Sequence, residues 1–99
     1  MEIFDGKSFE DAIKEGTTVV DFFATWCGPC KMLAPVLESA ASGHADIKFG
    51  KIDIDKDMDV ALKYKVMSVP TLIKFKDGEV VDKSIGFVSQ AELEDFLAR

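Results

Sequence analysis

The sequence predicts an α/β fold with a mixed central β-sheet and helices on both faces. Residues 17–24 form a β-rich run without polar–apolar alternation, and its part from residue 19 onward is apolar except for one acid, which is typical of a strand buried on both faces. Asp77-Gly78 lies between two β-rich runs and signals a hairpin. The 99 residues, 47% of them apolar, suffice for one compact domain with a real core and are too few for two domains. We therefore expect residues 1–99 to form a single domain.

The first half of the chain alternates strand and helix patterns. Residues 2–4 are predicted to be a short strand, and residues 8–14 a short helix capped by Ser8. The buried strand at residues 17–24 comes next. A helix then begins at the cysteine pair, with Pro29 in its first turn, where a missing N–H is tolerated.

That long helix is predicted to bend at Pro35, because an interior proline removes a backbone hydrogen bond. It is predicted to end at Gly43. Residues 47–54 read as a second buried strand. A short helix through Val60, Ala61 and Tyr64 follows an acidic stretch, where acids favour a helix start.

The second half ends in a hairpin and a helix. Residues 71–76 and 80–85 flank the Asp77-Gly78 turn and should pair as antiparallel strands. Ser89 and Glu92 form a capping box that opens the last helix. The predicted order is β-α-β-α-β-α-β-β-α, with the early strands parallel because helices join them.

The charge balance excludes several function classes. The chain carries 18 acids against 12 bases, a net charge of −6, so phosphate backbones and anionic membranes would repel it. No apolar run approaches the roughly 20 residues of a membrane span. The N-terminus lacks the basic start and apolar stretch of a secretory signal. We expect a cytoplasmic protein that binds neither nucleic acid nor membrane.

The two cysteines, Cys27 and Cys30, form a C-x-x-C pair at a strand-to-helix junction. Such a pair beside a βαβ pattern is typical of redox chemistry. Free N–H groups and the helix dipole favour a thiolate at Cys27. Cys30 lies one turn further on, where it can attack a sulfur bonded to Cys27. We predict that Cys27 is the nucleophile and Cys30 the resolving thiol.

A structural zinc site is the alternative interpretation of this pair. Tetrahedral zinc needs four ligands, whereas the chain offers two cysteines and one histidine, His44. Zinc would then have to be shared between two chains. We expect neither a bound metal nor a cofactor.

Residues 26–31, Trp-Cys-Gly-Pro-Cys-Lys, resemble the active site of the thioredoxin family. The resemblance spans nearly the whole chain at family-like spacing. Its other motifs are residues 20–22, 34–35, 51–53, 69–71, 75–78 and Gly86. The chain departs from the family at Phe23 and Met67, where many relatives carry tryptophan and a basic residue; both positions bear on partner preference. The resemblance implies the thioredoxin fold.

The resemblance implies that Asp21 is a buried acid beneath the cysteine pair. Burial among apolar neighbours raises the pKa of Asp21, so that it can exchange a proton with Cys30 through a water. Lys51 would lie on the adjacent strand near Asp21 and oppose that shift, which leaves the sign of the net effect open. An accidental polar position for Asp21 and a plain surface lysine at Lys51 are the alternatives.

The resemblance also implies a second wall for the site. Val69 would pair its backbone with an extended substrate segment, and Pro70 would follow a cis peptide bond. A flat apolar patch around Cys27 would bind protein substrates. Its residues would be Trp26, Gly28, Pro29, Met67, Val69, Pro70 and Gly86. Met67 has simple packing as an equal alternative.

The cysteine pair and the resemblance favour a general protein-disulfide reductase; the resemblance implies a redox carrier that a thioredoxin reductase re-reduces and that acts on disulfide-containing proteins. A related oxidase or isomerase is the first alternative, which Gly28-Pro29 disfavours because oxidants usually place a histidine there. A non-enzymatic binding module is the second. We expect a monomer.

Overall fold

The computed structural model describes residues 1–99 as five strands and four helices in the predicted order. The elements are β1 (Glu2–Phe4), α1 (Gly6–Ile13), β2 (Thr17–Phe23), α2 (Gly28–Gly43), β3 (Ile47–Asp53), α3 (Met58–Lys63), β4 (Thr71–Lys76), β5 (Glu79–Ile85) and α4 (Gln90–Ala98).

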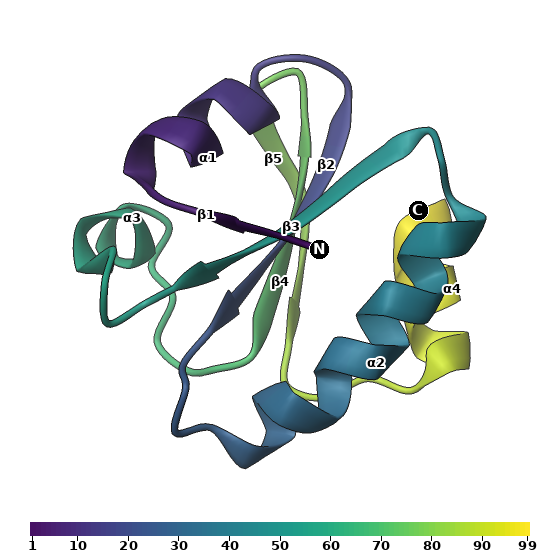
Figure 1. The fold of residues 1–99 in the computed structure, drawn as a ribbon. Helices are drawn as coiled ribbons and strands as arrows, with labels where there is room; N and C mark the ends of the chain where they lie inside the picture. Colours follow the sequence, from purple (N-terminus) through teal and green to yellow (C-terminus); the bar gives the residue numbers. More distant parts are fainter.

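One mixed sheet with the strand order β1-β3-β2-β4-β5 organises the molecule. β3 pairs in parallel with both β1 and β2, whereas β4 runs antiparallel to β2 and β5. Figure 1 shows α1 and α3 on one side of the sheet and α2 and α4 on the other. The predicted mixed sheet with helices on both faces is therefore confirmed.

The central strand β2 supplies side chains to two separate cores. Val20 and Phe22 belong to the cluster under α1 and α3, whereas Val19 belongs to the cluster under α2 and α4. Successive side chains of a strand point to opposite faces, so Asp21 lies on the α2/α4 face with Val19. Every residue from Thr18 to Phe22 is buried, which agrees with the apolar sequence of the run.

The core under α1 and α3 is aromatic. The rings of Phe4, Phe9, Phe22, Tyr64 and Phe75 pack mostly edge to face, with neighbouring centroids 5.2 to 6.5 Å apart. This arrangement matches the quadrupoles of the rings. The core under α2 and α4 is mainly aliphatic.

Gly50 lets β1 join the sheet. A Cβ atom on this glycine would lie 2.2 Å from Cε2 of Phe4, far inside van der Waals contact. Gly50 is also the register partner of Glu2 in β1 and of Val20 in β2. The bare backbone of β3 is therefore the surface on which the Phe4 ring rests.

The predicted cap of the first helix is wrong. α1 begins at Gly6, and its N-cap is Asp5, not Ser8. The Ser8 N–H donates to Asp5 Oδ1 at 2.8 Å, and the Asp5 N–H donates to Ser8 Oγ at 2.9 Å. Ser8 is therefore the third residue of a capping box, and the helix starts one turn earlier than its apolar pattern indicates.

The predicted hairpin turn is confirmed. Asp77 and Gly78 have φ values of 49° and 88°, both in the left-handed region that a two-residue hairpin loop of this kind requires. Asp77 Oδ1 also accepts the Gly16 N–H at 2.8 Å, which ties the hairpin to the loop before β2.

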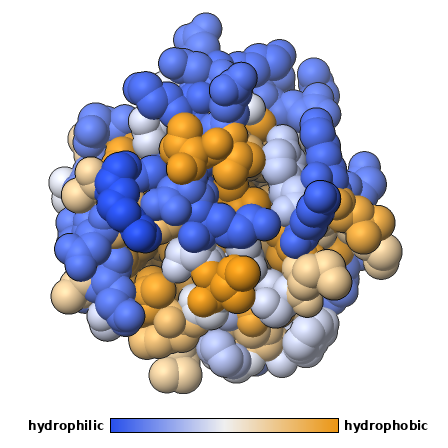
Figure 2. Space-filling view, turned by 180° about the vertical axis from the view of Figure 1, so that it is seen from behind, coloured by the Kyte–Doolittle hydropathy of each residue, from blue (hydrophilic) through white to orange (hydrophobic).

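None of the four helices is both long and apolar enough to cross a membrane. Seen from behind, the surface is mostly hydrophilic, and its hydrophobic residues form several small patches separated by polar ones (Figure 2).

Candidate active site

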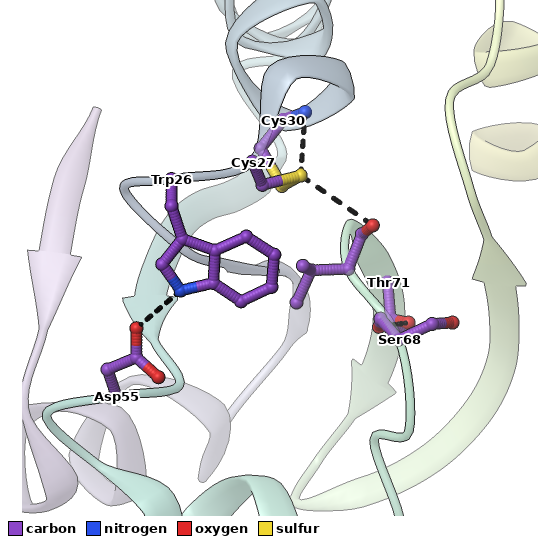
Figure 3. The surroundings of a disulfide bond; sticks show 7 residues. Trp26, Cys27, Cys30, Asp55, Ser68 and Thr71 are labelled. Carbon is purple, nitrogen blue, oxygen red and sulfur yellow. Dashed lines mark hydrogen bonds between the residues drawn. A yellow bond between two sulfur atoms is a disulfide. The ribbon is translucent and has the colours of Figure 1, made fainter.

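The cysteine pair lies at the start of α2, where the chain leaves the end of β2. Cys27 is the N-cap residue of α2, with Gly28 and Pro29 as its first helical residues. A disulfide joins Cys27 and Cys30, whose Cα atoms are 5.3 Å apart. The Cys30 N–H donates to Cys27 Sγ at 3.2 Å (Figure 3). The sulfur of Cys27 thus takes the place that a capping oxygen usually has.

This position favours negative charge on Cys27 when the disulfide is open. The first N–H groups of a helix have no partners within the helix, and they carry the positive end of its dipole. Pro29 has no N–H, so it neither needs a partner nor competes for the sulfur. Both cysteines are almost fully buried, each 4% exposed.

A loop before β4 forms a second wall beside Cys27. Cys27 Sγ lies 3.6 Å from the carbonyl oxygen of Val69, the residue before Pro70 (Figure 3). The Val69–Pro70 peptide bond is cis, as the sequence resemblance implied. The Gly86 N–H donates to the Pro70 carbonyl oxygen at 2.8 Å and so fastens this wall to the end of β5.

Asp21 is a buried acid without a hydrogen-bond partner. Its side chain is 1% exposed, and neither carboxylate oxygen has a hydrogen-bond partner. Desolvation raises the pKa of Asp21 to about 7, against a smaller opposing attraction from the Lys51 ammonium. The net shift of the Asp21 pKa, whose direction the sequence leaves open, is therefore upward, because the effect of burial is larger than that of the nearby cation.

Lys51 is half-buried and is the register partner of Asp21 on the neighbouring strand β3. Its Nζ atom lies 4.4 Å from the centroid of the Phe23 ring. The ring face attracts the ammonium without neutralising it, so the positive charge stays near Asp21. The plain surface lysine of the alternative interpretation does not describe this position.

Asp55 is a residue of the site that the sequence analysis missed. Its Oδ2 accepts the indole N–H of Trp26 at 2.9 Å, and Figure 3 shows the Trp26 indole beside the cysteine pair with its nitrogen facing Asp55. Asp53 Oδ1 in turn accepts the Asp55 N–H at 2.9 Å. The Asp-x-Asp spacing at the end of a strand is the local signal for such a turn, whereas the acidic stretch by itself indicates only a helix start.

The residues predicted for the apolar patch differ in exposure. Trp26 is 68% exposed and Met67 is 91% exposed, while Gly28 and Pro29 are also exposed. Packing as an explanation for Met67 is therefore wrong. Val69 and Gly86 are half-buried, and Pro70 is buried.

An open depression of about 380 Å³ adjoins the pair on the Cys30 side. Phe23 and Ala34 supply apolar lining, and Lys31 and Lys51 supply two cations. No three histidine, cysteine or acidic side chains lie close enough together to hold a metal ion. What the arrangement offers chemically is a disulfide at a helix N-terminus, a buried acid with a pKa near neutrality and an exposed indole.

Comparisons with known proteins agree with this description. The thioredoxin sequence profile matches residues 1–99. Thioredoxin of Staphylococcus epidermidis is 54% identical over 92 residues, which cover 90% of this chain and 86% of that protein. Thioredoxin of Staphylococcus aureus is 52% identical over the same shares of the two chains.

Solved structures show the same fold. Oxidised mitochondrial thioredoxin 3 from Saccharomyces cerevisiae superposes with a TM-score of 0.90 at 35% identity, covering 99% of this chain and 93% of that one. Plasmodium falciparum thioredoxin reaches 0.93 at 32% identity, covering 99% and 97%. With its sequence, its fold and its cysteine pair in agreement, the chain belongs to the thioredoxin family.

Proposed function

We propose that this chain is a general protein-disulfide reductase that works by dithiol–disulfide exchange. The observation that carries the proposal is the Cys27–Cys30 disulfide across the first turn of α2, in a chain of the thioredoxin family. A bridge of this kind closes a ring of only four residues and contributes roughly 2 kcal/mol by the chain-entropy estimate. The bridge therefore adds little to stability, and it is easily opened and closed, as dithiol–disulfide exchange requires.

The exchange proceeds in two steps. The Cys27 thiolate attacks one sulfur of a substrate disulfide, whose S–S bond breaks as one thiolate leaves and a mixed disulfide forms. The Cys30 thiolate then attacks Cys27 Sγ, which re-forms the Cys27–Cys30 disulfide and releases the second substrate thiolate. Two electrons pass from the protein to the substrate, and two protons end on the substrate thiols.

Asp21 is the proposed proton carrier for Cys30. A carboxyl with a pKa of about 7 is near half-protonation at neutral pH, so it can both take and return a proton. Lys51 is the proposed positioning residue for this charge, because its ammonium opposes the desolvation of the Asp21 carboxylate. Without Lys51 the pKa of Asp21 would rise further.

The proposed substrate surface surrounds Cys27. Trp26, Met67 and the Gly28-Pro29 pair present exposed apolar or backbone surface. Val69 presents backbone groups that an extended segment can pair with. Pro70 and Gly86 support that wall from behind. Apolar and backbone contacts of this kind tolerate many sequences, which suits a general reductase.

We propose further that a thioredoxin reductase re-reduces the protein and that its substrates are disulfide-containing proteins. Residues 1–99 are proposed to act as one domain and as a monomer in the cytoplasm. The net charge of −6 disfavours nucleic acid and anionic membranes as partners.

The replacement Cys27→Ser tests the nucleophile. The variant is expected to lose disulfide reduction entirely, because serine cannot form the mixed disulfide. The measurement is the reduction of a disulfide-containing protein such as insulin by protein primed with dithiothreitol. Unchanged reduction would end the reductase proposal. The exposed Ser42, replaced by alanine, is a matched control that should keep full activity.

The replacement Cys30→Ser tests the resolving role. This variant is expected to trap substrate on Cys27, since no second thiol releases it. Mass spectrometry after mixing with an oxidised substrate should show a mixed disulfide, and its absence would overturn the two assigned roles. A redox titration of the wild-type pair separates a reductant from the alternative oxidase, which would titrate at a more positive potential.

A further inference from the structure

The depression beside Cys30 is distinct from the substrate surface around Cys27. Its lining contains Phe23 and Lys51 from the sheet and Cys30, Lys31 and Ala34 from α2. Neither Trp26 nor Cys27 lines it. A pocket of about 380 Å³ falls at the low end of small-molecule sites, so it has room for a ligand of modest size.

The charge of this depression is opposite to that of the molecule. Two lysines line it and no acid does, although the chain has 18 acids and 12 bases. Neither Lys31 nor Lys51 forms an ion pair within the protein. The carboxyl that acts on Lys51 belongs to Asp21, which is buried, does not line the depression and is partly protonated near neutral pH because of its raised pKa. Two cationic groups therefore remain available to an anion.

The apolar part of the lining complements the two cations. The Phe23 ring already accepts the Lys51 ammonium on its face at 4.4 Å. This contact fixes the ammonium at the edge of an apolar floor that Ala34 extends. The hydroxyl of Thr25, also in the lining, can donate one hydrogen bond. A ligand that fits has one anionic end and a flat or branched apolar body.

We propose that this depression is a binding site for a small organic carboxylate. The carboxylate lies between Lys31 and Lys51, and the apolar body rests on Phe23 and Ala34. Because Cys30 belongs to the same lining, the bound molecule covers the resolving cysteine and leaves Cys27 free. Occupancy therefore acts on the second step of disulfide exchange and not on the first.

Benzoate is a suitable probe for the oxidised, uniformly labelled protein. Amide chemical shifts of Thr25 and Ala34 are expected to change and saturate, with a dissociation constant on the order of 1 mM. Binding should weaken as the ionic strength rises, because salt screens charges at an exposed site. Benzamide, the neutral analogue of the same shape, is expected to bind at least about threefold more weakly.

Charge-removing variants locate the site. Lys31→Gln is expected to weaken benzoate binding about twofold to fivefold, as for an exposed ion pair. Lys7→Gln removes the same charge from α1 on the opposite face of the sheet and should leave binding unchanged. Equal binding of benzoate and benzamide, equal weakening by both variants, or the lack of a saturable shift would each overturn the proposal.

A kinetic experiment tests the position over Cys30, and only this experiment rests on the proposed reductase function. Saturating benzoate is expected to slow the release of substrate from the mixed disulfide several-fold, without changing how fast that mixed disulfide forms. Unchanged release, despite binding in the titration, would overturn the placement over Cys30. Failure of the reductase function itself would leave no mixed disulfide to observe, while the titration would still give its own answer.

Discussion

Asp21 and Lys74 are both charged, both deeply buried and on adjacent strands of the same face, yet their surroundings differ. Lys74 is 3% exposed, and its ammonium donates to the carbonyl oxygens of Phe96 at 2.9 Å and of Arg99 at the end of α4. Asp21 is 1% exposed, and its two oxygens accept no hydrogen bond. The lysine closes a helix C-terminus, where carbonyls otherwise lack partners.

The difference separates an architectural polar group from a reactive one. A buried polar group with partners stabilises the fold and holds one geometry. A buried carboxyl without partners destabilises its own charged form, which moves its pKa into the range where it can transfer protons. Removing the charge should therefore raise the stability of the folded protein at Asp21 and lower it at Lys74.

The largest expected effect is a gain of stability in Asp21→Asn. The pKa of Asp21 is about 7 in the folded protein and 3.8 without perturbation, so ionisation costs the folded state more than the unfolded one. Wild-type stability should fall as pH rises through the window from 3.8 to about 7 and then level off. The variant escapes this loss and should be more stable by about 4 kcal/mol at about pH 8.5, with little difference at about pH 4.

Denaturant unfolding of the oxidised proteins across this pH range measures the effect. Glu10→Gln, which removes an exposed acid from α1, is the matched control and should change stability by less than about 0.5 kcal/mol. A stability difference between Asp21→Asn and wild type that stays constant with pH would contradict the assigned pKa. The same variant should turn over disulfides more slowly at neutral pH if Asp21 carries the Cys30 proton.

The second effect is a loss of stability in Lys74→Met. Methionine fills a similar volume but leaves the Phe96 and Arg99 carbonyl oxygens without their donor, which should cost about 1–3 kcal/mol. Disulfide turnover should not change, because Lys74 lies outside the site. The measurement is unfolding together with insulin reduction. Lys76→Met, an exposed position on the same strand, is the control. If Lys74→Met were as stable as wild type, these hydrogen bonds would not hold α4.

The smallest expected effect on stability comes from removing Asp55, the hydrogen-bond acceptor of the exposed Trp26 indole. Asp55→Ala removes the acceptor of the Trp26 indole N–H, yet Trp26 is 68% exposed and water can replace the carboxylate. Stability should fall by less than about 1 kcal/mol. Trp26 is the only tryptophan, so its fluorescence anisotropy reports the freed side chain directly. Lys56→Ala is the neighbouring control, and an anisotropy equal to that of wild type would show that Asp55 does not hold the ring.

Much of the fold was predictable because its signals are local. The buried run at β2, the left-handed turn at Asp77 and Gly78 and the Ser89 capping box depend on neighbours in sequence, and all three are confirmed. The cysteine pair was equally visible, because the chemistry of a C-x-x-C motif lies in four consecutive residues. The burial of Asp21 also followed from its apolar neighbours.

The missed features depend on partners far away in the chain. Lys74 alternates with apolar residues in β4 and so looks like a solvent-facing position, until the end of α4 covers it 22 residues later. Trp26 finds Asp55 only because β3 brings residue 55 alongside the end of β2. The exposure of Met67 likewise required the path of the loop before β4. Pattern alone cannot supply such pairings.

The alternation of side chains along β2 gives the molecule two independently adjustable interiors. Val20 and Phe22 pack in the aromatic core, whereas Phe23 packs beside the cysteine pair and Lys51, and Lys51 also acts on Asp21. Because these side chains belong to different clusters, we expect the free energies of substitutions on the two faces to be nearly additive. Substitutions at even-numbered positions of β2 can therefore change the stability of the aromatic core, while substitutions at its odd-numbered positions change the pKa of the site.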